Sequence, residues 1–240
     1  LLKLEYQNLF ASLFKNHERH VAVVETLSKK AKGLQRSELA NLSKQANGGT
    51  FTAILDELEH CGFIKKYPPF GKQYRDSLYQ LVDPYTLFYL KFIKNSKGSA
   101  SGSWLKRLHH PKWRSWSGYA FEYLCISHVE SIKKCLGIAG VYSEISSWRS
   151  SQSKQGAQID LIIDRDDRII NLCEIKFSES PYTITKSYAQ NLQNKLWAFK
   201  EESKTRKTIF LTMICTFGLK ENVYSNSLVQ HKLDINALFE

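Results

Sequence analysis

Three ionisable residues, Asp160, Glu174 and Lys176, have the types and spacing needed for metal-dependent chemistry. They lie on two apolar segments, 157–164 and 169–177, that we expect to be strands. Because side chains alternate between the two faces of a strand, Glu174 and Lys176 lie on the same face of the second strand. Carboxylate oxygens suit Mg²⁺ or Mn²⁺ rather than zinc. Lys176 beside such an ion would orient an attacking water or stabilise negative charge that develops on a phosphate.

The register of this strand pair decides whether the two carboxylates meet. The connecting residues 165–168, Arg-Asp-Asp-Arg, suit a hairpin turn. If Arg165 pairs with Ile169, Asp160 lies directly opposite Glu174. Two adjacent carboxylates repel each other unless a divalent cation lies between them. The residues alone leave one alternative open, a half-exposed strand face on which the same charges form surface ion pairs.

A fourth acidic residue, Glu122, lies in an apolar segment, 118–130, that we expect to be a helix. A carboxylate in such a helix is disfavoured unless it has a partner. A helical Glu, then a strand Asp160, then Glu174-Ile175-Lys176 after 13 further residues resembles the pattern of the PD-(D/E)xK nuclease superfamily. Ile159 replaces the proline for which that pattern is named.

The resemblance implies a role for each of these residues. Asp160 and Glu174 would be ligands of Mg²⁺ or Mn²⁺, together with the main-chain carbonyl of Ile175. Lys176 would activate water or stabilise the transition state, and Glu122 would orient the metal shell or Lys176. Some nuclease families place a further polar residue nearby, for which the candidates here are Tyr182, Lys186 and Gln190.

The first third of the chain has the element order of a winged helix-turn-helix, in which three helices precede a β-hairpin. We expect helices at 20–32, 37–46 and 50–60 after a leading helix at 4–15, and strands at 63–67 and 77–82. Thr50 is the expected N-cap of the third helix. The candidate nucleic-acid contacts are Asn47, Thr50 and Thr52 near that helix and Lys65, Lys66, Lys72 and Arg75 of the hairpin.

The expected recognition helix, 50–60, has a charge that argues against DNA contact. It carries Asp56, Glu57 and Glu59 and no lysine or arginine. Carboxylates facing phosphates weaken binding to DNA. The alternative is that this module docks another protein or connects domains, because a fold does not determine a function.

A segment at 104–118 combines tryptophans with basic residues. Trp104, Trp113 and Trp116 are interleaved with four cations that we include among the candidate nucleic-acid contacts, Lys106, Arg107, Lys112 and Arg114. Aromatic and basic residues together can stack on bases and bind phosphates. We favour the alternative that this is an amphipathic segment whose tryptophans dock the two domains, because exposed tryptophans are the exception.

The charge of the chain is unevenly distributed. The 240 residues include 34 Lys+Arg and 23 Asp+Glu, a net charge of +11. Residues 1–150 contribute +10 of this and residues 151–240 only +1. The excess suggests a polyanionic partner, for which we expect DNA; no basic amphipathic helix supports membrane binding. Five cysteines without a CxxC pair and the lack of a signal sequence favour the cytoplasm. Oligomeric state stays open.

The whole arrangement resembles the C-terminal region of archaeal-type AAA+ ATPases. This resemblance implies an α/β fold of two domains joined by a Gly/Ser-containing linker at 96–109. The first is an N-terminal winged helix domain at 1–95, and the second is a restriction-endonuclease-like α/β/α domain with a mixed central sheet at 110–240. It also implies an ATPase domain upstream in the same polypeptide, since no P-loop motif occurs here and the sequence begins without Met.

We therefore expect a metal-dependent DNA phosphodiesterase, endonuclease-like, attached to a winged helix. One alternative is a nucleic-acid-binding or regulatory module that retains the nuclease fold without hydrolysis. Another is a module that only binds proteins, which would have no affinity for DNA at physiological salt.

Overall fold

The computed structural model describes residues 2–30, 33–71, 77–94, 110–150 and 157–239. The chain is a mixed α/β protein that divides into two compact units. Unit 1 comprises Leu1–Pro68 and Gln73–Ala120, and unit 2 comprises Pro69–Lys72 and Phe121–Glu240. The expected linker at 96–109 lies outside the described residues. In the described part of the chain, no helix is long and apolar enough to cross a bilayer.

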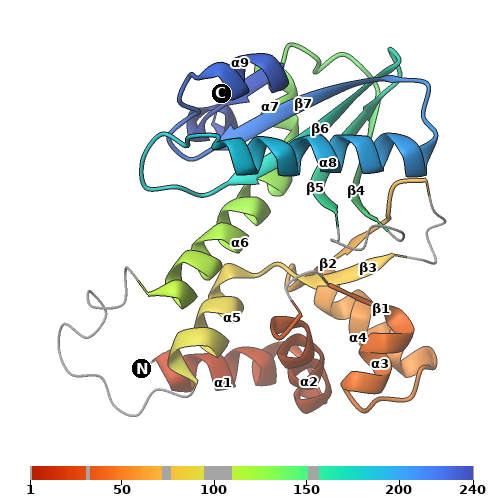
Figure 1. Cartoon of the computed structure of the whole chain (residues 1–240). Coiled ribbons are helices and arrows are strands. Elements are labelled where there is room, and N and C mark those ends of the chain that lie inside the picture. The colour runs from red at the N-terminus through yellow and green to blue at the C-terminus, as the bar shows by residue number, and fades with distance from the viewer. Residues whose placement is uncertain (1, 31–32, 72–76, 95–109, 151–156, 240) are drawn as a thin grey trace. The chain divides into compact units, whose positions relative to one another are not determined.

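Unit 1 consists of helices and a small antiparallel sheet (Figure 1). Its helices are α1 (Leu2–Leu13), α2 (His17–Ser28), α3 (Arg36–Leu42), α4 (Gly49–His60), α5 (Pro84–Phe88) and the π-helix η2 (Tyr89–Ile93), followed by the start of α6 (Pro111–Ser127). Its strands are β1 (Leu34–Gln35), β2 (Ile64–Tyr67) and β3 (Leu78–Leu81), in the order β1-β3-β2. The expected helices and both hairpin strands are therefore present, whereas β1 was not expected.

The buried residues of unit 1 account for the position of its helices, whereas the residues at which the helices begin and end differ from those expected. Phe51, Leu55 and Leu58 are fully buried at helical spacing along α4. The expectation that Thr50 caps this helix is wrong, because Gly48 is the N-cap residue and Thr50 lies within the helix. The glycine pair that precedes Thr50 lets the chain enter the helix without a side-chain cap. The two preceding helices also end earlier than expected.

Unit 2 is built on a mixed five-stranded sheet with the strand order β4-β5-β6-β7-β8 (Figure 1). The strands are β4 (Ser143–Arg149), β5 (Gln158–Arg165), β6 (Ile169–Lys176), β7 (Thr208–Cys215) and β8 (His231–Leu233). Strands β4, β5 and β6 are antiparallel neighbours, and β6, β7 and β8 are parallel. The helices are the end of α6, α7 (Val129–Cys135), α8 (Lys186–Ser203), α9 (Val223–Leu228) and the 3₁₀-helix η4 (Ile235–Leu238).

The β5–β6 hairpin has the register that the turn predicts. The ladder runs from the pair Leu161–Cys173 to the pair Asp164–Ile170. The paired residues end at Leu161, which is next to Asp160 in the chain, and β5 shifts its register against β4 between Ile162 and Ile159. The positive φ of 68° at the last turn residue, Arg168, lets the chain reverse tightly.

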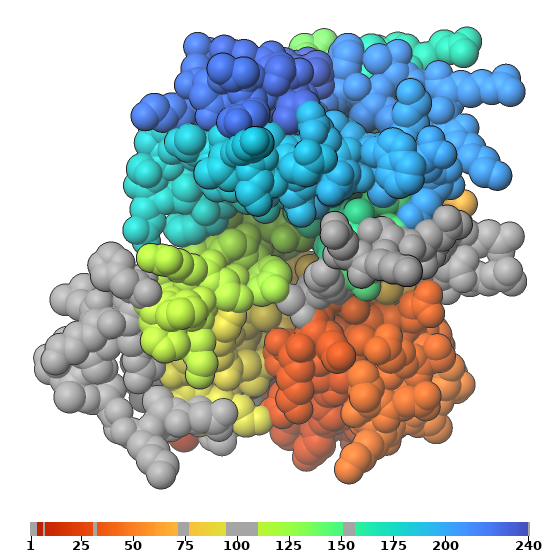
Figure 2. All heavy atoms as spheres, in the orientation of Figure 1, coloured from red at the N-terminus to blue at the C-terminus, as the bar shows by residue number. Residues whose placement is uncertain are grey.

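Helices cover both faces of the sheet of unit 2. Helix α8 crosses from β6 to β7 and covers one face, whereas α7 and the end of α6 lie against the other (Figure 1). Ile162 and Leu172 of the sheet pack in one buried cluster with Ala198 and Phe199 of α8. In Figure 2, the residues of α8 form a continuous band across this face of unit 2. Glu174 is two residues from Leu172 in the same strand, so its side chain lies on the same face, the one that α8 covers.

Candidate active site

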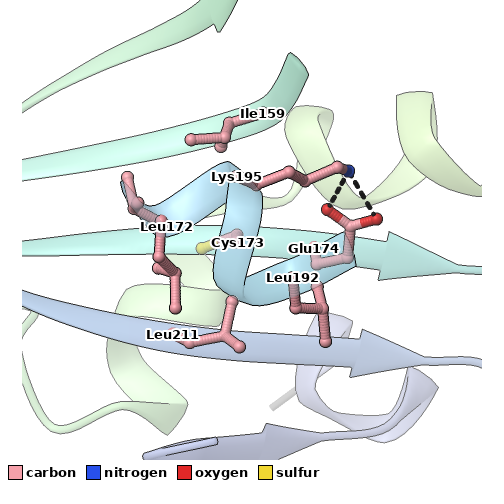
Figure 3. A pocket seen from close by; sticks show the side chains of 8 residues that line it. Ile159, Leu172, Cys173, Glu174, Leu192, Lys195 and Leu211 are labelled. Carbon is pink, nitrogen blue, oxygen red and sulfur yellow. Dashed lines mark hydrogen bonds and ion pairs between the residues drawn. The ribbon is translucent and has the colours of Figure 1, made fainter. Parts of the chain in front are cut away.

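Glu174 lies at the centre of a buried polar cluster. It is only 2% exposed. Its Oε1 accepts hydrogen bonds from the Tyr188 hydroxyl (2.6 Å) and from Nζ of Lys195 (3.0 Å), and it lies 2.9 Å from Nζ of Lys176. Nζ of Lys195 also donates to Oε2 at 2.8 Å. Figure 3 shows the Lys195 side chain extending from its helix to both oxygens. One carboxylate is thus bound by two cations and a phenol.

Helix α8 supplies two residues of this cluster that the sequence analysis did not identify. Tyr188 and Lys195 are seven residues apart, so they lie on the same face of the helix, two turns from each other. The buried Leu192 and Phe199 continue this face toward the sheet. A lysine within the apolar stripe of an amphipathic helix was the signal that could have identified Lys195.

Two further carboxyls, those of Glu122 and Asp160, belong to the same electrostatic cluster. Burial, then the negative charge of Asp160, raises the pKa of Glu122 to about 8. Burial, then the charge of Glu174, raises the pKa of Asp160 to about 6. Lys176 and Lys195 oppose both effects without cancelling them. Burial is therefore the main reason that these two carboxyls keep their protons to a higher pH than usual.

The charges of Glu174 and Lys176 stabilise each other. Burial raises the pKa of Glu174, but Lys176 and Lys195 outweigh burial and lower it overall. Burial lowers the pKa of Lys176, but Glu174 outweighs it and the net direction is upward. Burial and the Glu174 charge raise the pKa of Tyr188, so its hydroxyl keeps its proton and acts as a donor. Nζ of Lys176 also lies 5.3 Å from the centre of the Tyr188 ring.

One polar atom beside Asp160 lacks a partner among the described residues. Nε2 of Gln158 donates to Oδ1 of Asp160 at 3.2 Å, whereas the buried Oε1 of Gln158 accepts no hydrogen bond there. A buried acceptor of this kind normally binds a donor such as water. Beneath Glu174 and Lys195, a pocket of about 10 Å³ has otherwise mainly apolar walls, including Ile159 and Leu192 (Figure 3).

The structure brings Glu122, Asp160, Glu174 and Lys176 into one cluster, but not as a ready-made metal site. In the described ranges, no three His, Cys, Asp or Glu side chains are gathered so that they could hold a metal ion. Both Glu174 oxygens face lysine ammonium groups instead. Ile175, whose carbonyl was the third expected ligand, is buried in β6 and pairs with Ile214 of β7.

The further polar candidates divide into two groups. The Tyr182 ring contacts the Tyr188 ring edge-on at 5.5 Å, so it packs beside the cluster. Lys186 and Gln190 instead line an open hollow of about 680 Å³ on the exposed side of α8. The Gln190 amide donates to Asn194 at 3.2 Å, which lines the same hollow. These two residues therefore do not join the Glu174 cluster.

The expected nucleic-acid contacts of unit 1 are only partly described. Thr50 and Thr52 are exposed, and the Thr52 hydroxyl accepts a hydrogen bond from Arg36 at 2.8 Å. Lys65 is exposed and Lys66 half-buried on the hairpin strand β2. Four further candidates lie outside the described residues, Lys72, Arg75, Lys106 and Arg107. Arg36 was not among the expected contacts.

Two tryptophans of α6, Trp113 and Trp116, contact aromatic residues of unit 1. The Trp116 ring contacts Phe88 at 5.6 Å, and the Trp113 ring contacts Phe92 at 6.3 Å. The Trp116 indole also donates to the carbonyl of Pro84 at 3.3 Å. These contacts do not support stacking of the two rings on bases. The basic residues of the same helix, Lys112 and Arg114, are exposed.

Comparisons of the chain with protein-family models, with curated proteins and with solved structures found no significant match.

Proposed function

We propose that unit 2 is a metal-dependent phosphodiesterase of the PD-(D/E)xK type that cleaves DNA. The observation that carries this proposal is the convergence of Glu122, Asp160, Glu174 and Lys176, from three different elements, on one cluster. The β5–β6 ladder supports it, because the pair Leu161–Cys173 is adjacent in sequence to Asp160 and Glu174, and the charge of Glu174 raises the pKa of Asp160. Perturbed carboxyl pKa values with named charged partners are typical of functional sites.

The donor set fits a hard divalent cation. All candidate ligands are oxygens, which Mg²⁺ and Mn²⁺ prefer. Burial, and then a neighbouring carboxylate, raises the pKa values of Glu122 and Asp160, so a divalent cation would stabilise their ionised forms. The unpaired Oε1 of Gln158 offers a further acceptor, for a water bound to the ion. Such an ion, when bound, would polarise a phosphate and lower the pKa of a water.

The side chains have distinct roles in this proposal. Asp160 and Glu174 would hold the cation, and Glu122 would orient it or Lys176. Lys176, 31% exposed at its side chain, is accessible to a substrate and would orient water or contact the phosphate. The Tyr188 hydroxyl fixes the direction of the Glu174 carboxylate.

Cleavage of supercoiled and branched DNA in Mg²⁺ or Mn²⁺ tests the proposal. Glu174→Ala, Lys176→Ala and Asp160→Asn should each reduce cleavage by about 100-fold or more. Asp164→Asn is the matched control, because this acid lies on the same strand but pairs with Lys207 at 2.6 Å. No cleavage by the wild type, or equal cleavage by the Glu174 and Lys176 variants, would refute a nuclease.

One observation favours a second candidate, a nucleic-acid-binding module without hydrolysis. Lysines occupy both oxygens of Glu174, so the cluster as described is a set of ion pairs. DNA binding that depends on salt and survives loss of Asp160, Glu174 and Lys176 would support this alternative. A module that binds only proteins, in contrast, would show no affinity for a labelled duplex at physiological salt.

In this proposal, unit 1 is a winged helix that contacts DNA, and an ATPase domain lies upstream in the same polypeptide. Support for the winged helix comes from the order of α2, α3 and α4 before the β2–β3 hairpin. Exposed Thr50, Thr52 and Lys65 are available for phosphate contacts. Substituting Lys65 should weaken duplex binding similarly for all sequences and reduce its salt dependence.

A further inference from the structure

We propose that Lys195 is an internal counter-ion that takes the place of the cation on Glu174 when no metal is bound. This inference rests on the proposed function, because it concerns the same carboxylate. Nζ of Lys195 lies 3.0 Å from one Glu174 oxygen and 2.8 Å from the other. It therefore approaches both oxygens at once, as a divalent cation bound to both would.

Burial explains why Glu174 needs such a partner. At 2% exposure, its charge has almost no contact with water. An ionised carboxylate in such a place is costly unless opposite charge and hydrogen bonds compensate it. Lys176 lies 2.9 Å from Oε1, whereas Lys195 lies within hydrogen-bond distance of both oxygens and is 2.8 Å from Oε2. A metal ion that binds this carboxylate would therefore compete with Lys195.

The position of Lys195 permits this exchange. Its side chain is 20% exposed, and it belongs to α8 rather than to the strand that carries Glu174. A lysine has a flexible four-carbon stem, so the ammonium group can move toward water while the helix stays in place. Once released, its positive charge remains beside the site, where a phosphate of the substrate would bind.

Mn²⁺ binding to the whole chain without DNA tests the exchange. Lys195→Met removes the competing ammonium group and should bind Mn²⁺ at least about tenfold more tightly than the wild type, because a charge-assisted hydrogen bond no longer opposes the ion. Lys200→Met, on the exposed side of the same helix, should leave Mn²⁺ affinity unchanged. Glu174→Gln should abolish the tight binding of the Lys195→Met variant.

A second measurement uses the wild type and so does not depend on whether a variant folds. Labelling with an amine-reactive reagent, read by mass spectrometry, should become faster at Lys195 when Mn²⁺ is added and stay constant at Lys200. Equal Mn²⁺ affinity of wild type and Lys195→Met, or constant labelling of Lys195 with Mn²⁺ bound, would overturn the exchange and leave the proposed nuclease intact. No Mn²⁺ binding by any form would overturn the exchange and the metal-dependent nuclease together.

Discussion

Replacing Glu122 by Gln should flatten the pH dependence of folding stability. The Glu122 carboxyl has a pKa of about 8 in the folded protein against an ordinary value of 4.5. Between these pH values, the folded protein holds a proton that the unfolded chain has released. The free energy of unfolding therefore falls as the pH rises through this interval, and the loss is complete above the folded pKa.

The magnitude follows from the width of that interval. Each pH unit corresponds to about 1.36 kcal/mol, so the full interval corresponds to about 5 kcal/mol. Glu122 retains some contact with solvent, which screens part of the penalty. We therefore expect the wild type to lose about 2–4 kcal/mol relative to Glu122→Gln between about pH 5 and pH 8.

Urea unfolding monitored by circular dichroism at several pH values measures this difference. The difference between the free energies of unfolding of the two proteins removes the contributions of groups that titrate in both. One such group is Glu174, whose lowered pKa makes stability fall with decreasing pH. Glu130→Gln is the control, because this carboxylate is 71% exposed and lies in the following helix. If the wild type and Glu122→Gln lost stability in parallel from pH 5 to pH 8, the argument that Glu122 is buried and protonated would be wrong.

Three further substitutions should each lower the urea midpoint. Tyr188→Phe keeps the ring but removes the 2.6 Å hydrogen bond to Glu174, at a cost of about 1–2 kcal/mol. Asp83→Ala removes the side chain that caps α5, at a cost of about 1 kcal/mol. Asn171→Ala removes a fully buried amide whose oxygen accepts from Arg165 at 3.3 Å, at a cost of about 1–3 kcal/mol. No change in midpoint for a variant would refute its assigned contact.

The strand pair at the site could be predicted from the sequence because its determinants are local. A short polar turn between two apolar segments fixes the register, and strand alternation then assigns each side chain to a face. The observed pairing of Leu161 with Cys173 confirms the hairpin register up to the residue that follows Asp160, whereas the shift of β5 against β4 at this point was not predicted. Long helices with apolar stripes, such as α4 and α8, were predictable for a similar reason.

Contacts between distant segments could not be predicted in this way. Lys195 contacts Glu174 because α8 packs at one position along the strands. That position depends on the packing of buried side chains such as Phe199 against the sheet. Short elements were also missed, including β1, α7, α9, β8 and η4. Strand β1 has only two residues, and its pairing with β3 depends on the tertiary fold rather than on local propensity.

Two of the three acidic residues of α4 have hydrogen-bond partners within unit 1. Oε2 of Glu57 forms a 2.7 Å contact with the buried ring of His20, and Oε1 of Glu59 accepts from the backbone N–H of Lys66. These two carboxylates therefore serve the packing of unit 1. At the other end of the helix, the Arg36 guanidinium donates to the Thr52 hydroxyl and to the carbonyl of the N-cap residue. A cation from a neighbouring helix thus joins the positive end of the α4 dipole, so the N-terminal turn favours a phosphate more than the charges of α4 alone indicate.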